Sequence, residues 1–147
     1  MATNKPVIRL YFNYPFSLKN RRSLKYYLIQ LFQTEQTSLE ALSLVFCSDD
    51  QLLSLNQQYL SHDTFTDILT FRLSEPAFPL IAELYISIER IRDNAVIFHT
   101  SPTHELLRVI FHGCLHLCGY NDKTNRQKTA MTNKEDHYLS NYLKGST

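Results

Sequence analysis

The chain contains 147 residues, of which 44% are hydrophobic and 20% are charged, and its formal net charge is +1 at pH 7. These proportions are typical of one folded domain spanning residues 1–147, and they exclude a disordered chain. A net charge this close to zero also excludes a bulk electrostatic attraction to nucleic acid, so nucleic-acid binding would need a local basic patch.

Apolar residues at alternating or helical spacing predict nine secondary-structure elements along the chain. In chain order, we expect an edge strand at residues 6–12, a helix at 20–34, a strand at 41–47, a helix from Ser48 or Asp49 to Tyr59, strands at 68–73 and 82–88, and helices at 89–99, from Ser101 onward and from Thr124 to Gly145. The predicted fold class is therefore α+β, a single mixed four-stranded sheet packed with about five helices.

The most informative stretch is residues 110–122, which read IFHGCLHLCGYND. His112 and His116 stand four residues apart in an apolar helical run, so their rings lie one turn apart on the same face of the helix. Gly119 suits the left-handed residue that often ends a helix. Because the chain can then double back, we expect Asp122 to join the two histidines as a third, oxygen ligand.

The helix that carries the histidines has a wide apolar arc. This arc is formed by Leu106, Leu107, Ile110, Phe111, Cys114, Leu117 and Cys118. The opposite side is formed by Glu105, Arg108, His112 and His116. We therefore expect the apolar arc to pack on the sheet and the histidines to face a cleft. The two cysteines on the apolar arc are interpreted as small buried hydrophobic residues, not as metal ligands.

Two imidazoles and one carboxylate leave a coordination position open, as in catalytic rather than structural zinc sites. An ion held in this way lowers the pKa of its bound water toward about 7. We therefore expect one zinc ion per chain, held by His112, His116 and Asp122, although these ligands also suit nickel and other divalent ions. The reactive group would be the activated water, and no side chain is assigned as catalytic.

The spacing matches the metzincin pattern His-Glu-x-x-His-x-x-Gly-x-x-His, in which the glutamate is the general base. Here Gly113 stands in place of that glutamate, and Asp122 stands in place of the last histidine. A peptidase needs the glutamate to deprotonate the attacking water, so Gly113 argues against peptidase activity. We expect a zincin-like metal cleft that serves a different hydrolysis.

These residues resemble the YbeY family of bacterial endoribonucleases. The resemblance rests on the run His112-Gly113-Cys-Leu-His116-Leu-Cys-Gly119-Tyr120 with Asp122, Met131 and Glu135, and upstream on Leu55-Asn56 with Tyr59, Asp63, residues 66–71 and residues 82–87. It covers residues 43–143, whereas the first 40 residues agree only in pattern.

The resemblance implies a single-strand-specific metallo-endoribonuclease that acts in 16S rRNA 3′-end maturation and in ribosome quality control. It also implies zinc on three ligands, with rRNA and the small ribosomal subunit as partners, and a cytoplasmic location. The odd number of cysteines, three, agrees with a reducing compartment. No apolar run approaches the roughly 20 residues of a membrane helix, so a membrane is not an expected partner. DNA is not an expected partner either.

The chain departs from the family pattern at three places. Asn121-Asp122 stands where Asp-His is usual, Leu60 stands where an arginine is usual, and Ala82-Glu83 stands where Gly-Asp is usual. The resemblance implies a catalytic or phosphate-binding role for that arginine. Either Arg72 or Arg108 substitutes for it as a substrate-binding cation, or the phosphate is stabilised differently.

His62 and Asp63 are further candidates for substrate binding, because the resemblance places their loop near the metal. Hydrogen bonding within the loop explains the same two residues equally well. A second function also stays open, namely a non-catalytic ribosome assembly factor with a structural metal. The missing arginine at Leu60 and the near-neutral charge favour that alternative.

Overall fold

The computed structural model describes residues 5–60 and 66–145. Its elements are β1 (Val7–Phe12), α1 (Arg21–Thr34), β2 (Leu39–Cys47), α2 (Asp49–Leu60), β3 (Ile68–Arg72), β4 (Leu80–Ser87), α3 (Ile88–Ile97), α4 (Pro102–Leu117) and α5 (Asn125–Gly145). The predicted order of strands and helices is confirmed, and the bounds lie within about two residues of those expected, which is the usual uncertainty of helix ends. Among the described residues, no helix is long and apolar enough to cross a membrane.

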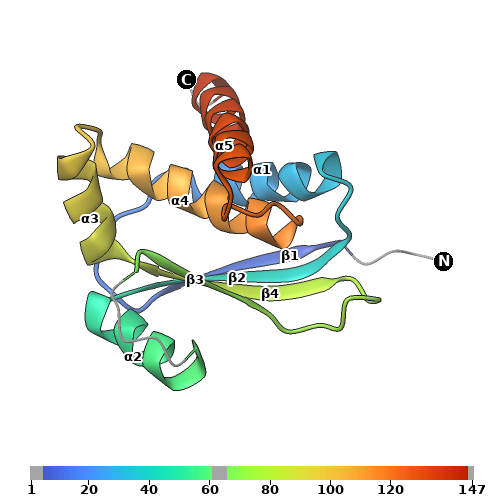
Figure 1. Cartoon of the computed structure of the whole chain (residues 1–147), viewed down its shortest axis with the longest axis horizontal. Coiled ribbons are helices and arrows are strands. Elements are labelled where there is room, and N and C mark those ends of the chain that lie inside the picture. The colour runs from blue at the N-terminus through green and yellow to red at the C-terminus, as the bar shows by residue number, and fades with distance from the viewer. Residues whose placement is uncertain (1–4, 61–65, 146–147) are drawn as a thin grey trace.

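The four strands form one mixed sheet in the order β1-β2-β4-β3. β1, β2 and β4 run parallel, whereas β3 is antiparallel to β4, and β1 lies at an edge as predicted. Figure 1 shows α1 and α4 on one face of the sheet and α2 on the other. In this view α4 lies between the sheet and α5, which makes it the central helix of the fold.

The starts of α4 and α5 are both capped as the sequence predicts. The Ser101 hydroxyl accepts a hydrogen bond from the His104 amide at 3.0 Å at the start of α4. At the start of α5, the Thr124 hydroxyl accepts from the Gln127 amide at 3.1 Å, while the Gln127 side chain accepts from the Thr124 amide at 3.0 Å. This reciprocal pair is a capping box, which satisfies amide groups that would otherwise lack partners.

The apolar arc of α4 packs into the core as expected. Its members Leu106, Leu107, Ile110, Phe111 and Cys114 are all at most 4% exposed. The prediction for Glu105 needs a correction, because this carboxylate is only 1% exposed although the helical pattern puts it on the polar side. The polar side of α4 is therefore partly covered by neighbouring elements.

Gly113 lies where α4 packs closely against β3 and β4. A Cβ atom built on this glycine would lie 2.6 Å from Cδ1 of Ile68 in β3 and 3.1 Å from both δ carbons of Leu84 in β4. Real Cβ atoms essentially never lie at the shorter distance, so a larger residue would force the side chains of Ile68 and Leu84 to repack. The glycine that replaces the peptidase glutamate therefore has a packing role of its own.

The end of α4 turns the chain back toward the histidines. Gly119 adopts a φ of 104°, which side chains with a Cβ rarely accept. Its amide donates to the carbonyl of His116 at 3.0 Å, and the Tyr120 amide donates to the carbonyl of Leu115 at 3.1 Å. These two bonds define a Schellman motif, and they direct residues 120–122 back along the helix.

Candidate metal centre

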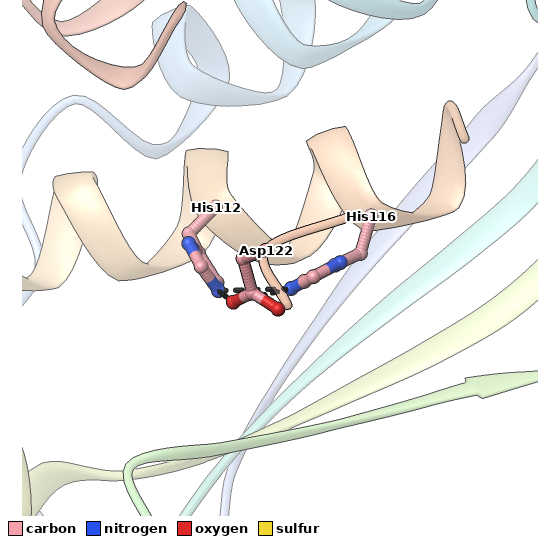
Figure 2. A group of neighbouring side chains, drawn as sticks. All are labelled: His112, His116 and Asp122. Carbon is pink, nitrogen blue, oxygen red and sulfur yellow. Dashed lines mark hydrogen bonds and ion pairs between the residues drawn. The ribbon is translucent and has the colours of Figure 1, made fainter. Parts of the chain in front are cut away.

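The side chains of His112, His116 and Asp122 converge on one point beside α4 (Figure 2). The two Nε2 atoms lie 3.0 Å apart. Oδ2 of Asp122 lies 3.4 Å from Nε2 of His112 and 3.3 Å from Nε2 of His116. The structure therefore brings together all three residues that the sequence pattern proposes as metal ligands.

This triangle of atoms has the dimensions of one face of a metal coordination tetrahedron. Zinc binds imidazole nitrogen and carboxylate oxygen at about 2.0–2.1 Å, which in a tetrahedron puts neighbouring ligand atoms about 3.3 Å apart. The observed separations of 3.0–3.4 Å lie close to that value. A divalent ion therefore fits the site with only small side-chain movements.

The outer nitrogens of the two rings fix the direction in which each ring can bind. Nδ1 of His112 lies 2.6 Å from Oε2 of Glu135, and Nδ1 of His116 lies 2.9 Å from the carbonyl oxygen of Tyr120. A carbonyl and an ionised carboxylate can only accept, so both Nδ1 atoms act as donors. Each Nε2 then carries a lone pair that points at the other ring and at Asp122.

Three acceptor atoms that face one another repel unless a cation lies between them. The chemistry of the donor set therefore fits a metal ion, and each histidine has an outer partner of the kind that metal-bound histidines usually have. The side chains of His112, His116 and Asp122 are 20%, 28% and 40% exposed. Because all three reach solvent, an ion held by them would keep a position open to water.

The carbonyl that supports His116 is itself held in place through the side chain of Tyr120. The Tyr120 hydroxyl donates to Glu35 at 2.7 Å, and Glu35 also accepts from Lys134 at 3.2 Å and from Tyr138. Burial raises the pKa of Glu35, but these hydrogen bonds outweigh burial and lower its pKa overall. Nothing in the local sequence pattern links Glu35 to this site, because it lies 85 residues away from Tyr120.

The four residues that the sequence proposes for substrate binding differ in what the structure shows of them. His62 and Asp63 lie outside the described residues. Arg72 donates to the backbone carbonyls of the β3–β4 turn, at distances of 3.0–3.3 Å, and so it stabilises that turn. Arg108 donates to Glu105 and to Glu135. A role in substrate binding for any of these residues stays a prediction.

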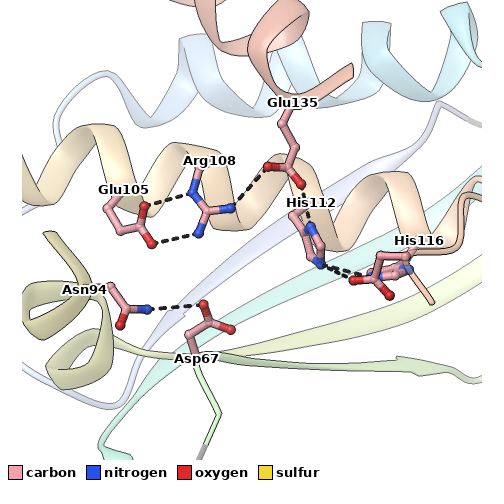
Figure 3. Close-up of polar contacts among 8 residues, drawn as sticks. Asp67, Asn94, Glu105, Arg108, His112, His116 and Glu135 are labelled. Atoms are coloured by element: carbon pink, nitrogen blue, oxygen red, sulfur yellow. Dashed lines mark hydrogen bonds and ion pairs between the residues drawn. The ribbon is translucent and has the colours of Figure 1, made fainter. Parts of the chain in front are cut away.

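Asp67, just before β3, is a further carboxylate near the histidines (Figure 3). Burial raises its carboxyl pKa, and the nearby positive charge of Arg108 opposes that rise. Its Oδ2 accepts a hydrogen bond from Asn94 at 3.4 Å. The sequence pattern includes Asp67 only as part of a longer motif, because no helical or strand spacing relates it to His112.

The two cysteines near the end of α4, Cys114 and Cys118, do not belong to the group of candidate metal ligands. Cys114 is fully buried, which agrees with the sequence prediction, and Cys118 is partly buried. Burial raises the pKa of Cys118 to about 11 and that of Cys114 well above its usual value. Both thiols therefore stay protonated at neutral pH, and a protonated thiol is a poor metal ligand.

An α+β fold in which a sheet-packed helix carries two convergent histidines, and the following turn supplies a third donor, defines a zincin-like fold with a candidate metal site. A family model described as "Endoribonuclease YbeY" matches residues 16–143. The chain belongs to the YbeY endoribonuclease family.

Individual relatives agree with this assignment. The chain is 42% identical over 125 residues to an endoribonuclease YbeY of Cytophaga hutchinsonii, covering 85% of this chain and 87% of the relative. It is 40% identical over 130 residues to the one of Flavobacterium psychrophilum, covering 87% and 92%. A solution structure of a Thermotoga maritima protein matches with a TM-score of 0.65 at 27% identity, covering 95% of this chain and 90% of that one.

Proposed function

We propose that this protein is a zinc-dependent, single-strand-specific endoribonuclease that acts in 16S rRNA 3′-end maturation and ribosome quality control. The observation that carries the proposal is the convergence of three acceptor atoms, from His112, His116 and Asp122, within 3.0–3.4 Å of one another. The relatives named endoribonuclease support RNA as the substrate. The proposed partners are rRNA and the small ribosomal subunit, and the proposed location is the cytoplasm.

When bound, the ion would act as a Lewis acid that lowers the pKa of water and offsets charge on a phosphodiester. His112 and His116 hold the site through their Nε2 atoms, because their Nδ1 hydrogens are committed to Glu135 and Tyr120. Asp122 adds a negative charge where a third histidine would be neutral. The aspartate therefore weakens the ion as an acid, and we expect cleavage to need a higher pH than it would with three imidazoles.

The test is cleavage of defined RNA by the purified protein with zinc restored, compared with the His116→Ala variant. A matched control is His137→Ala, because His137 is exposed on α5 and belongs to no metal-ligand group found among the described residues. We expect wild type and His137→Ala to cleave single-stranded RNA but not duplex RNA, and His116→Ala to lose at least a hundredfold in rate. Equal residual rates in all three proteins would indicate a contaminant and refute the proposal.

The ends of the products distinguish two routes of attack. Water attack leaves a 5′-phosphate, whereas attack by the ribose 2′-hydroxyl leaves a 2′,3′-cyclic phosphate. We propose water attack, because the open coordination position is the place where a metal site holds water. A cyclic phosphate on the products would overturn that part of the proposal.

One structural observation favours a second candidate, a non-catalytic ribosome assembly factor with a structural metal. Arg72 and Arg108 were the proposed substitutes for the arginine missing at Leu60, and both donate to other parts of the chain. This candidate predicts that the wild type binds both rRNA and zinc, while neither the wild type nor His116→Ala cleaves RNA. The cleavage assay therefore separates the two candidates.

A further inference from the structure

A chain of ion pairs runs from α4 through α5 to the first metal-ligand candidate (Figure 3). Nε and Nη2 of Arg108 each donate to one carboxylate oxygen of Glu105 at 2.8 Å. Nη1 of the same guanidinium donates to Oε1 of Glu135 at 3.1 Å. The other oxygen of Glu135 accepts from Nδ1 of His112 at 2.6 Å. The contacts therefore form a continuous relay, Glu105–Arg108–Glu135–His112.

Burial makes this relay costly unless it is complete. The side chains of Glu105 and Glu135 are 1% and 5% exposed, and that of Arg108 is 29% exposed. A buried carboxylate without a partner is strongly unfavourable, and here the one guanidinium serves both carboxylates. The hydrogen bonds that Arg108 donates to Glu105 are the largest cause of its raised pKa, so the guanidinium stays charged.

The charges of the relay favour a cation at the proposed site. Glu105, Glu135 and Asp122 carry negative charge, as does the nearby Asp67 when it is ionised, whereas Arg108 supplies one positive charge. A divalent cation on the neutral rings of His112 and His116 would offset negative charge that remains. Arg108 thus serves the internal balance of the site, because three of its five N–H donors are already committed to Glu105 and Glu135.

The two histidines have outer partners of different kinds. His116 relies on the backbone carbonyl of Tyr120, which no side-chain substitution removes directly. His112 relies on a flexible glutamate side chain, which has several rotamers unless something holds it. Among the described residues, Arg108 and, through Arg108, Glu105 are the partners that hold Glu135 in the relay. A defect in the relay should therefore act on His112 and spare His116.

We propose that Glu105 and Arg108 are positioning residues of the metal centre, which clamp Glu135 so that it holds the Nδ1 hydrogen of His112 and aims Nε2 at the ion. This inference rests on the proposed metal site and replaces the expectation that Arg108 binds substrate. Outer partners of metal-bound histidines typically contribute about 10- to 100-fold to metal affinity. Arg108 should therefore contribute to zinc affinity although it does not touch the ion.

The first experiment measures the zinc dissociation constant of the full chain by competition with a chromogenic chelator, for wild type, Arg108→Gln and Arg108→Lys. We expect Arg108→Gln to bind zinc about tenfold or more weakly. Arg108→Lys keeps the charge but cannot make the paired contact with Glu105, so its affinity should lie between the other two. The lysine variant also provides a result if Arg108→Gln does not fold.

The matched control is Asp49→Asn, which removes the ion pair of 2.7 Å between Arg90 and Asp49. That pair joins α2 to α3 and lies outside the relay. Its loss should lower the thermal midpoint but leave zinc affinity within twofold of wild type. A similar loss of affinity in Asp49→Asn would show that any lost ion pair weakens the site, and it would overturn the positioning role.

A double-substitution cycle tests whether Arg108 acts through Glu135. Glu135→Gln keeps an acceptor for His112 but removes the charge that Arg108 holds. If the relay operates, Arg108→Gln weakens zinc binding tenfold in wild type and by less than twofold in the Glu135→Gln background. Equal effects in both backgrounds would mean that Arg108 acts by another route, which overturns the proposal.

Nitrogen-15 NMR of the imidazole rings gives a readout that does not depend on activity. In the zinc-loaded wild type, both Nδ1 atoms should carry a slowly exchanging hydrogen. In Arg108→Gln, hydrogen exchange at His112 should become at least tenfold faster, while His116 stays unchanged. Unchanged exchange at His112, together with unchanged zinc affinity, would overturn the positioning role alone. A wild type that takes up no zinc would instead refute the metal-centre proposal on which the inference rests.

Discussion

Nε2 of His112 and Nε2 of His116 lie 3.0 Å apart. In the neutral rings, the hydrogens are on the opposite side, on the Nδ1 atoms that face Glu135 and the carbonyl of Tyr120. Two facing lone pairs at this distance repel each other, and a cation between them removes that repulsion. This relationship is the physical basis of the predictions that follow.

The identity of residue 122 should control zinc affinity. Asp122→Ala removes one of three donors, so we expect at least a hundredfold weaker zinc binding in a chelator competition. Asp122→His restores a nitrogen donor that zinc binds at a similar distance, and its affinity should stay within about tenfold of wild type. Asp136→Ala, an exposed aspartate on α5, is the control and should match wild type. Full affinity in Asp122→Ala would remove this residue from the site.

Gly113 should be intolerant of a side chain even where helix propensity favours one. Gly113→Ala gains up to about 1 kcal/mol of helix propensity, but the new Cβ would lie 2.6 Å from Ile68. Overpacking in a core costs about 1–3 kcal/mol, so we expect a net loss of unfolding free energy in urea titrations. Gly145→Ala meets no atom within 4 Å and should change stability by less than about 0.5 kcal/mol.

Glu35 should make stability depend on pH in the acid range. Its folded-state pKa is lowered below the usual value of 4.5, so ionised Glu35 stabilises the fold above pH 4.5. That contribution is lost as the pH falls below 4.5 and through the folded-state pKa. Glu35→Gln should therefore lower the thermal midpoint at pH 7 by more than it does at pH 3. A difference between wild type and variant that is the same at both pH values would contradict this account.

Asp67 should affect the pH dependence of stability in the direction opposite to that of Glu35. Burial raises its pKa in the folded state, so the ionised carboxylate destabilises the fold at neutral pH, and protonation at low pH relieves that penalty. We expect Asp67→Asn to raise the thermal midpoint at pH 7 and to change it little at pH 3.5. If the ionised Asp67 carboxylate contributes to RNA cleavage, that contribution offsets its cost in stability. RNA cleavage by Asp67→Asn should then fall about tenfold or more. A variant that is less stable at pH 7 would refute this reading of Asp67.

The parts of the site that were predictable from the sequence are those fixed by local geometry. His112 and His116 converge because they lie one turn apart on a helix, and Asp122 returns to them because Gly119 ends that helix in a left-handed turn. The sheet was predictable for a similar reason, since each strand shows its own alternation or apolar run.

The rest of the site depends on contacts between elements that are distant in sequence. Glu135 reaches His112 only through the packing of α5 on α4, and Glu35 reaches Tyr120 from the end of α1. Glu105 appears on the polar side of the helical wheel, but neighbouring elements bury it, and its ion pair with Arg108 offsets the cost of that burial. Gly113 was interpreted only as a missing catalytic base, because the closeness of Ile68 follows from the fold and not from the pattern.

The most direct test of the central claim is the metal content of the full-length protein, purified without an affinity tag and without added metal. Elemental analysis should find about one divalent ion per chain, or a titration with zinc should reach that stoichiometry, and His116→Ala should hold far less. A content near zero in the wild type that stays near zero throughout the titration would contradict the claim that His112, His116 and Asp122 form a metal centre.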